Sequence, residues 1–281
     1  MNKQKSISEH ISAYENHLRL EEKSTATIEK YLRDIRAFAC WLDRREITKE
    51  RTAEWKTHLV ERGYAPASIN AMLSALNGLL DFLDLGTCQV KFLKLQRRMF
   101  RDDSRDLTRA DYERLVATAQ ERGQNRLALL MEAICATGIR VSEVRYITVE
   151  AAKAGRAEIA LKGKIRTILI PNKLCRKLLK YAKNNKTASG EIFLTRNGTP
   201  LSRRQIWAEM KGLCKAAGVM ASKVFPHNFR HLFATAFYRA SRDIVKLADV
   251  LGHSSIETTR IYLLTSGAEH QRQLDRLGLV S

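Results

Sequence analysis

The chain has 281 residues, 44% of them hydrophobic, and its 49 lysines and arginines exceed its 30 acidic residues to give a net charge of +19. This length suits two domains, and the charge favours a folded nucleic-acid-binding protein over a membrane-binding one. No apolar run predicts a transmembrane helix, and the polar N-terminus predicts no secretory signal. The cysteines lack metal-ligand spacing, so we expect a cytoplasmic protein with reduced thiols and with no metal or cofactor.

Residues 1–87 are predicted to form a small helical domain. Apolar residues recur at helical spacing, and the face opposite the apolar stripe of the best-defined helix is basic. The expected helices cover 6–20, 24–45, 48–62 and the segment that follows Pro66. The basic face supplies three candidate DNA contacts, Lys30, Arg33 and Arg36.

Residues 88–105 lack a long periodic stripe and are predicted to be a basic linker between the domains. Arg97 and Arg98 are candidate DNA contacts there. A basic linker between two basic domains suggests a clamp around an anionic partner, although a short helix with a solvated charged face is equally compatible with the pattern.

Residues 106–281 are predicted to form a second domain that is mainly helical and holds one small antiparallel sheet. The stretch AEIALKGKIRTILIP alternates on both sides of KGK, which predicts a hairpin with Gly163 at its turn. Helices are expected near 106–120, 126–138, 172–184, 202–217, 228–238, 242–250 and 255–264. Arg203 and Arg204 begin one of these helices and could enter a major groove or contact phosphates.

Four stretches of the second domain hold more polar side chains than a structural role requires. They are ATGIRVSEV with Arg140, the hairpin tip with Lys162, Lys164 and Arg166, FPHNFRH with His227 and Arg230, and LGHSSIETTRIYLLTS with His253 and Tyr262. Each stretch alone is weak evidence for a catalytic site. Isolated arginines and histidines are usually surface or capping residues, and such a tyrosine is usually a core residue. Together they suit phosphoryl transfer without a metal: arginines hold the phosphate oxygens, a hydroxyl attacks, and a histidine and a lysine move protons.

These stretches resemble the tyrosine recombinases, that is, phage-type integrases and Xer-like enzymes. The resemblance covers nearly the whole chain. The motif of the family's N-terminal core-binding domain is matched by Ser24, Thr27, Tyr31, Asp34 and Ile35. The motifs of its catalytic domain are matched by Thr137-Gly138-Ile139-Arg140 with Ser142 and Glu143, by His227 with Arg230 and His231, and by Leu251-Gly252-His253 with Tyr262.

The resemblance implies a helical, SAM-like core-binding domain, an α+β catalytic domain and a role for each matched residue. Tyr262 would be the nucleophile that forms a 3′-phosphotyrosyl link to DNA. Arg140 and Arg230 would hold the scissile phosphate, His227 would be a general base or a phosphate contact, and His253 would donate a hydrogen bond to the phosphate. Glu143 would orient the site, whereas His231 would pack.

The hairpin departs from the family pattern G-K-G-x-K-x-R, in which the first lysine is the general acid for the 5′-hydroxyl. Here the stretch is Leu161-Lys162-Gly163-Lys164-Ile165-Arg166, which is one residue shorter. Alignment on Lys-Gly selects Lys162, and Lys164 remains an alternative.

The resemblance implies double-stranded DNA with a specific recombination site as the partner and a homotetramer on two such sites. A catalytically silent DNA-binding protein and a type IB topoisomerase-like enzyme are the alternatives. Integration, excision, inversion and dimer resolution all remain open, with the unusual hairpin slightly favouring a mobile element. The tail GAEHQRQLDRLGLVS could add one helix that docks on a neighbouring protomer or on its own.

Overall fold

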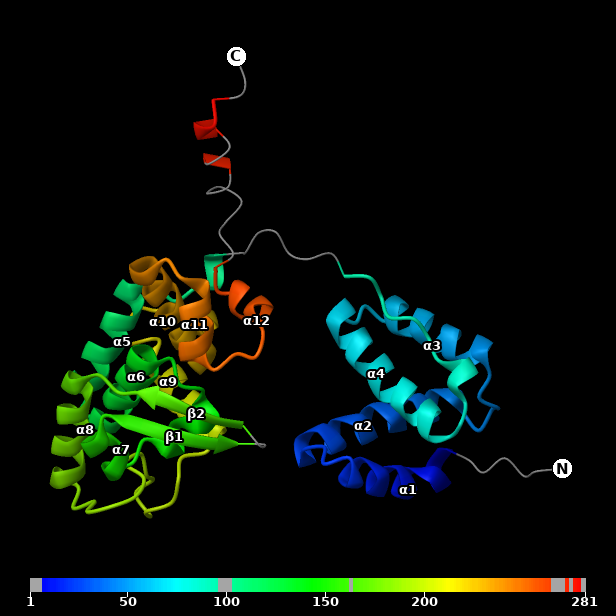
Figure 1. The fold of residues 1–281 in the computed structure, drawn as a ribbon, viewed down its shortest axis with the longest axis horizontal. Coiled ribbons are helices and arrows are strands. Elements are labelled where there is room, and N and C mark those ends of the chain that lie inside the picture. The colour runs from blue at the N-terminus through cyan, green and yellow to red at the C-terminus, as the bar shows by residue number, and fades with distance from the viewer. Residues whose placement is uncertain (1–6, 96–102, 162–163, 264–270, 273–274, 279–281) are drawn as a thin grey trace. The chain divides into compact units, whose positions relative to one another are not determined.

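The computed structural model describes residues 7–95, 103–161, 164–263, 271–272 and 275–278 (Figure 1). The chain divides into two compact units, Met1–Arg97 and Arg98–Ser281. The domain boundaries predicted from the sequence lie close to this division and remain a prediction. We describe each unit by itself.

Over residues 7–95, the first unit is a bundle of four helices. They are α1 (Ile7–Leu20), α2 (Thr25–Leu42), α3 (Lys49–Glu61) and α4 (Pro66–Phe82), followed by a single 3-10 turn, η1 (Gly86–Cys88). The apolar stripes predicted for α2 and α4 meet in the core, where Phe38, Leu73 and Leu79 are fully buried. Pro66 opens α4 because its missing N–H is one of the unpaired donors of a first turn.

The core-binding motif residues have structural partners within this unit. Ser24 caps α2, and its hydroxyl lies 2.8 Å from that of Thr27. Asp34 is buried, and its carboxylate pairs with Lys30 at 2.5 Å and Arg33 at 3.3 Å. Two of the three candidate DNA contacts on α2 are therefore also partners of a buried carboxylate, and a DNA role for them remains a prediction.

Two asparagines of α4 hold the extended segment that follows η1. Asn77 bonds both the N–H and the C=O of Val90, at 3.0 and 2.9 Å. Asn70 does the same for Leu93, at 2.8 and 2.9 Å. Two helical turns advance about 10.5 Å, and three extended residues advance about 10 Å, so the two spacings match. The beginning of the segment predicted to be a linker is thus fixed to the first unit.

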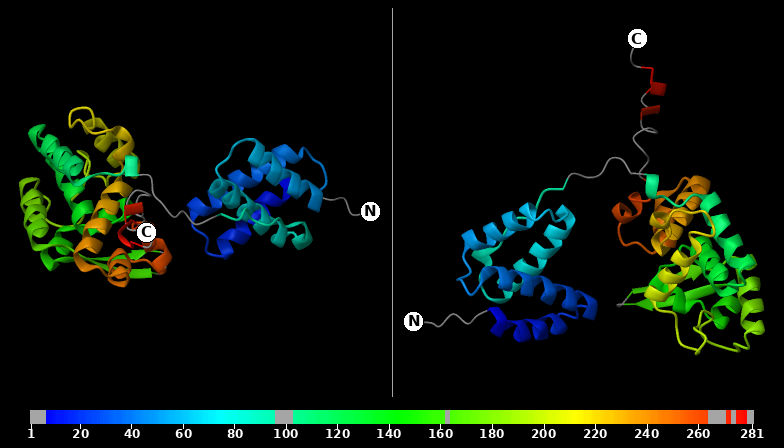
Figure 2. Two further views of the ribbon diagram at one scale, coloured as in Figure 1. Left: turned by 90° about the horizontal axis from the view of Figure 1, so that it is seen from above. Right: turned by 180° about the vertical axis from the view of Figure 1, so that it is seen from behind.

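The second unit consists of helices around one two-stranded sheet. Its α-helices are α5 (Arg109–Glu121), α6 (Asn125–Thr137), α7 (Val149–Ala154), α8 (Asn172–Asn184), α9 (Arg203–Leu213), α10 (Pro226–Ser241), α11 (Ile244–Leu251) and α12 (Ile256–Arg260). The 3-10 turns are η2 (Asp103–Arg105), η3 (Val141–Tyr146) and η4 (Ala221–Lys223). Figures 1 and 2 place α12 beside α11, on the side of this unit opposite α8.

Several of these elements differ from the sequence-based expectation. The short helix α7 and the turns η2, η3 and η4 were not expected. The helix predicted over 255–264 ends at Arg260, and His253 lies in the loop before α12 rather than at its start. Gly252 in the left-handed conformation ends α11 and produces this loop.

The predicted hairpin is present as β1 (Arg156–Leu161) and β2 (Lys164–Leu169), paired antiparallel with Leu161 opposite Lys164. Ile159 and Ile168 are buried, whereas Leu169 is exposed, as alternation across a half-buried sheet requires. The same alternation places Arg166 on the inward face with Ile168 and Ile170. From this face Arg166 reaches Glu143 of η3 and Leu251 of α11.

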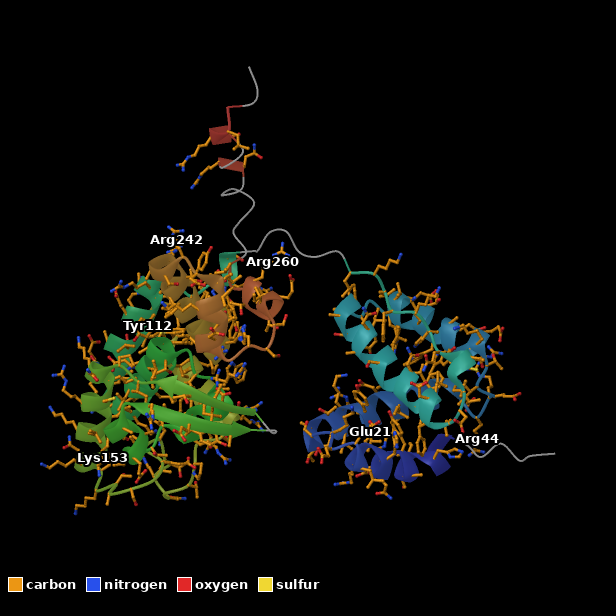
Figure 3. The ribbon with its side chains drawn as sticks, viewed as in Figure 1. Glu21, Arg44, Tyr112, Lys153, Arg242 and Arg260 are labelled. Atoms are coloured by element: carbon orange, nitrogen blue, oxygen red, sulfur yellow. The ribbon has the colours of Figure 1, made fainter. Side chains whose placement is uncertain are left out.

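Most charged side chains lie on the surfaces of the two units. Figure 3 labels Lys153 in the last turn of α7, Arg242 at the end of α10 and Arg260 at the end of α12, all exposed. No helix in the described part of the chain is long and apolar enough to span a membrane.

Candidate active site

The first element of the site is the turn after α6. Gly138 ends α6 at a φ of 63°, and a Cβ there would lie 2.4 Å from the ring of Phe233, so a side chain does not fit. Arg140 lies two residues further on and is the N-cap of η3. Its backbone N–H and its guanidinium donate to the two carboxylate oxygens of Glu143, each at 3.0 Å. Glu143 is 5% exposed and therefore orients Arg140 from below the surface.

Arg166 of β2 is a second partner of Glu143. Its Nη2 lies 2.5 Å from Glu143 Oε2, and its Nη1 donates to the carbonyl of Leu251. Arg166 thus joins the hairpin to both η3 and α11. Arg166 belongs to the hairpin motif, but the sequence predicted no role for it. The signal that could have identified it is the terminal arginine of that motif.

Arg230 is the most buried cation of the site, with an exposed fraction of 3%. Its guanidinium donates to the carbonyl of Gly138, to the carbonyl of Leu251 at 2.8 Å, and to His253 Nε2 at 3.0 Å. The carbonyl of Leu251 therefore accepts from both Arg166 and Arg230. Leu251 is the last residue of α11, where the helix dipole is negative, so a helix end helps to hold two cations close together.

His253 lies between Arg230 and α12. Its Nε2 faces Arg230, and its Nδ1 lies 2.8 Å from the hydroxyl of Thr259, which is fully buried. Burial, together with the charges of Arg230, Arg140, Arg166 and His227, lowers the pKa of His253 to about 4. His253 is therefore neutral at physiological pH.

Tyr262 is 4% exposed and is surrounded by three imidazole rings. Its ring centroid lies 5.3 Å from that of His231, 5.7 Å from that of His227 and 5.9 Å from that of His253, with the last ring nearly parallel to it. The tyrosine also packs with Ala234, Leu247 and Leu251. It is both a packing residue and a neighbour of every candidate catalytic histidine.

The arginines of the site repel one another. The pKa of Arg230 is lowered to about 10, chiefly by burial and also by the like charges of Arg140 and Arg166, while the Tyr262 hydroxyl opposes the shift. Burial also lowers the pKa of Arg166, an effect that Glu143 opposes. The Nε atoms of Arg166 and Arg230 are buried without a hydrogen-bond partner. A bound anion would relieve this repulsion.

Lowering the pH should destabilise the protein through His253. Its pKa is about 4 in the folded chain against an ordinary 6.5, so the unfolded chain binds more protons between these values. The free energy of unfolding should therefore fall as the pH drops from 6.5 toward 4, and His253→Asn should reduce this fall. Urea denaturation of both proteins near pH 7 and near pH 5 measures the difference. An equal loss in both would contradict the prediction.

Gly252→Ala should damage the site, because Gly252 has a φ of 63° and a Cβ there would lie 2.5 Å from Arg166 Cδ. Gly155→Ala is the matched control, since Gly155 has a φ of 69° and open space around the added Cβ. Both variants should lose about 1 kcal/mol of stability through backbone strain. Only Gly252→Ala should also displace Arg166 and slow DNA cleavage about tenfold or more. Denaturation curves and single-turnover cleavage rates compare the two, and equal cleavage would exclude the role assigned to Gly252.

The structure shows fewer contacts for the remaining candidate residues, which are the two hairpin lysines and the predicted DNA contacts. Lys162, Arg97 and Arg98 lie outside the described residues, and for Lys164 the structure describes only the backbone position in β2. Arg36 is exposed on α2. Arg203 and Arg204 are exposed in the first turn of α9, where Ser202 and Gln205 form a capping box. Their contacts with DNA remain predictions.

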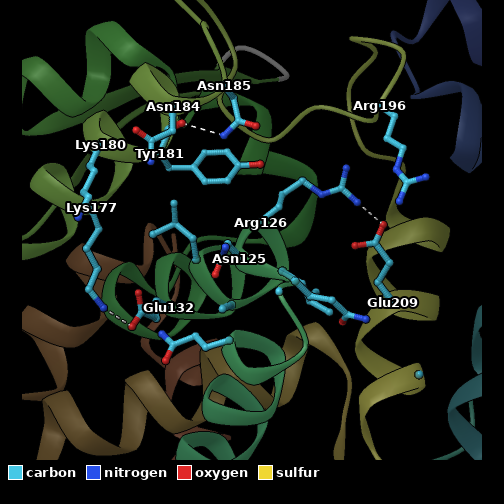
Figure 4. A pocket seen from close by; sticks show the side chains of 17 residues that line it. Asn125, Arg126, Glu132, Lys177, Lys180, Tyr181, Asn184, Asn185, Arg196 and Glu209 are labelled. Carbon is cyan, nitrogen blue, oxygen red and sulfur yellow. Dashed lines mark hydrogen bonds and ion pairs between the residues drawn. The ribbon is translucent and has the colours of Figure 1, made fainter.

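A separate hollow of about 960 Å³ lies among α5, α6, α8 and α9 (Figure 4). Two of its basic side chains face carboxylates: Arg126 pairs with Glu209 at 2.6 Å, and Lys177 pairs with Glu132 at 2.5 Å. No candidate catalytic residue lines it, so the hollow is distinct from the site around Tyr262.

The fold and the grouped arginines, histidines and tyrosine define the tyrosine recombinase class. The chain belongs to the phage integrase family, which it matches over residues 105–268, and residues 11–85 match the N-terminal SAM-like domain of phage integrases. These matches confirm the resemblance and the predicted fold class.

Relatives of known name support the same assignment. The chain is 29% identical to tyrosine recombinase XerA of Thermococcus kodakarensis over 94% of this chain and 93% of the relative. It is 28% identical to tyrosine recombinase XerD of Halalkalibacterium halodurans over 85% of this chain and 87% of the relative. The predicted enzyme class, a tyrosine site-specific recombinase, is confirmed.

Solved structures share the fold. A lambda integrase tetramer bound to a Holliday junction matches with a TM-score of 0.73 and 20% identity, over 93% of this chain and 78% of that chain. The XerH recombinase bound to its difH substrate matches with a TM-score of 0.68 and 19% identity, over 94% of this chain and 83% of that chain.

Proposed function

We propose that the chain cuts and rejoins double-stranded DNA at a specific recombination site, using Tyr262 as its nucleophile. The observation that carries this proposal is a continuous set of contacts. Arg140 and Arg166 share Glu143, Arg166 and Arg230 share the carbonyl of Leu251, and Arg230 contacts His253. This network ends beside the tyrosine.

The charge of the network suits a phosphate. Arg140, Arg166 and Arg230 bring three positive charges against the single negative charge of Glu143, and His253 is neutral. A phosphodiester carries one negative charge, and a second develops as a nucleophile attacks it. The excess positive charge therefore favours the transition state over the ground state.

The reaction needs a nucleophile and two proton transfers. The Tyr262 hydroxyl attacks phosphorus and loses its proton to His227, while Arg140 and Arg230 hold the nonbridging oxygens. The bond to the 5′-oxygen breaks, and the lysine of the hairpin, Lys162 or alternatively Lys164, protonates that oxygen. A 5′-hydroxyl from a second strand then reverses these steps. One diester is exchanged for another, so the energy of the bond is kept.

We further propose that four copies act on two DNA sites in the cytoplasm. The similarity to a lambda integrase structure described as a tetramer on a Holliday junction supports this assembly. Integration, excision, inversion and dimer resolution all use the same chemistry, and a role in a mobile element is one form of the proposal.

Trapping of the covalent intermediate tests the proposed function. A nicked DNA substrate that carries the recombination site loses a short fragment after cleavage, so religation fails and the adduct accumulates. Denaturing electrophoresis followed by peptide mass spectrometry should locate the DNA on Tyr262. DNA binding with no adduct would favour a catalytically silent binding protein, and supercoil relaxation without exchange between two sites would favour a topoisomerase-like enzyme.

A further inference from the structure

Thr259 is fully buried, and its hydroxyl lies 2.8 Å from His253 Nδ1. It precedes the nucleophile by three residues, and its carbonyl accepts from the Tyr262 N–H at 3.0 Å. One residue of the tyrosine-bearing segment therefore contacts the histidine through its side chain and the tyrosine through its backbone. None of the matched motifs includes it.

The donors around His253 fix its tautomer. A guanidinium has only donors, so His253 Nε2 must accept from Arg230, and a neutral imidazole then carries its proton on Nδ1. Thr259 Oγ1 then accepts a hydrogen bond from this Nδ1–H. Without that acceptor, a buried N–H would lose its partner, which costs about 1–3 kcal/mol.

We propose that Thr259 is a positioning residue that orients His253 from the helix that delivers Tyr262. This inference rests on the proposed function and deepens it. Because Thr259 and Tyr262 belong to the same short segment, Thr259 can hold His253 in this orientation only while Tyr262 lies in the site. Docking of α12 and preparation of the histidine are therefore one event.

A hydroxyl suits this position because it can both donate and accept. When a phosphate engages Arg230, His253 can donate from Nε2 to a phosphate oxygen only if its proton leaves Nδ1. Thr259 then donates to Nδ1 instead of accepting from it. The same side chain therefore satisfies His253 before and after the phosphate binds, which valine could not do.

Nitrogen NMR of histidine-labelled protein tests the orientation without DNA. In the wild type, His253 should show a protonated Nδ1 and an unprotonated Nε2, with the signals assigned by their loss in His253→Asn. Thr259→Ser should keep this pattern. In Thr259→Val, which has nearly the same shape, the Nδ1–H has no acceptor, so the ring should turn away from Arg230 and give the averaged signals of an imidazole that exchanges between tautomers. Thr258→Val is the matched control, because Thr258 is exposed on the same helix.

Single-turnover cleavage of the nicked substrate tests the consequence. Thr259→Val should cleave about tenfold or more slowly, by analogy with the loss of other partners that orient a histidine. Thr259→Ser and Thr258→Val should cleave at close to the wild-type rate, and all variants should bind DNA equally. An unchanged tautomer in Thr259→Val, or an altered tautomer with an unchanged cleavage rate, would overturn the proposal. If the wild type forms no adduct, the proposed function fails, while the NMR experiment still decides whether Thr259 orients His253.

Discussion

Tyr262→Phe is expected to abolish the covalent protein–DNA adduct and to leave DNA binding unchanged. The substitution removes only the hydroxyl, and the phenylalanine ring can keep the contacts with His231, His253 and the apolar cluster of α10 and α11. No residual adduct is expected, because the covalent bond itself requires the phenolic oxygen. The nicked substrate and a denaturing gel measure the adduct, and a gel shift measures binding.

Tyr238→Phe is the control for this substitution. Tyr238 lies on α10 and packs against the same apolar cluster, so it tests the loss of a tyrosine hydroxyl away from the phosphate site. It should cleave at the wild-type rate. An adduct in Tyr262→Phe would show that the nucleophile is assigned wrongly. Loss of the adduct in Tyr238→Phe would show that the apolar cluster does not tolerate substitution.

Arg230→Met should reduce cleavage about a thousandfold or more and cost only about 1–3 kcal/mol of stability, because the Gly138 carbonyl loses its donor. Removal of one preorganised donor to a developing negative charge typically costs about 10²–10³ in rate, and Arg230 supplies a full charge as well. No carboxylate pairs with Arg230 among its hydrogen bonds, which go to two carbonyls and His253, so its loss leaves no buried counter-charge behind. Methionine can fill the vacated space.

Single-turnover cleavage and thermal melting separate these two effects. Arg239→Met is the matched control, since Arg239 is exposed on the same helix and its loss should affect neither quantity. A large fall in melting temperature for Arg230→Met would mean that its role is structural. Cleavage within tenfold of the wild type would exclude Arg230 as a phosphate ligand.

Most helices could be predicted from the periodicity of apolar residues, because they are long enough to show an apolar stripe. The exception, α7, spans only Val149–Ala154, and fewer than two turns cannot define a period. The helix predicted to run through Tyr262 was too long, because the sequence does not show where a short helix ends. Its apolar residues read as helix, but Ile261 and Leu263 belong to a turn that places the tyrosine.

The sequence motifs grouped residues that the fold brings together. What the motifs could not supply is the pattern of donors and acceptors. Nothing in the sequence shows that Glu143 divides its carboxylate between Arg140 and Arg166, or that Leu251 offers one carbonyl to two arginines. These contacts join segments far apart in the chain, and they exist only once the hairpin and α11 have packed.

The two asparagines of α4 have a practical consequence for dividing the protein. Residues 89–93 have no regular secondary structure, and a cut there would seem harmless. Such a cut would strip Asn70 of its partner Leu93, and a cut before Val90 would also strip Asn77 and remove Val90, which is buried in the first unit's core. A fragment meant to fold as the first unit should therefore continue past Leu93. Insertions should be better tolerated after Leu93 than between Val90 and Leu93. An extra residue between these two would shift one of them out of register with the asparagine that holds it.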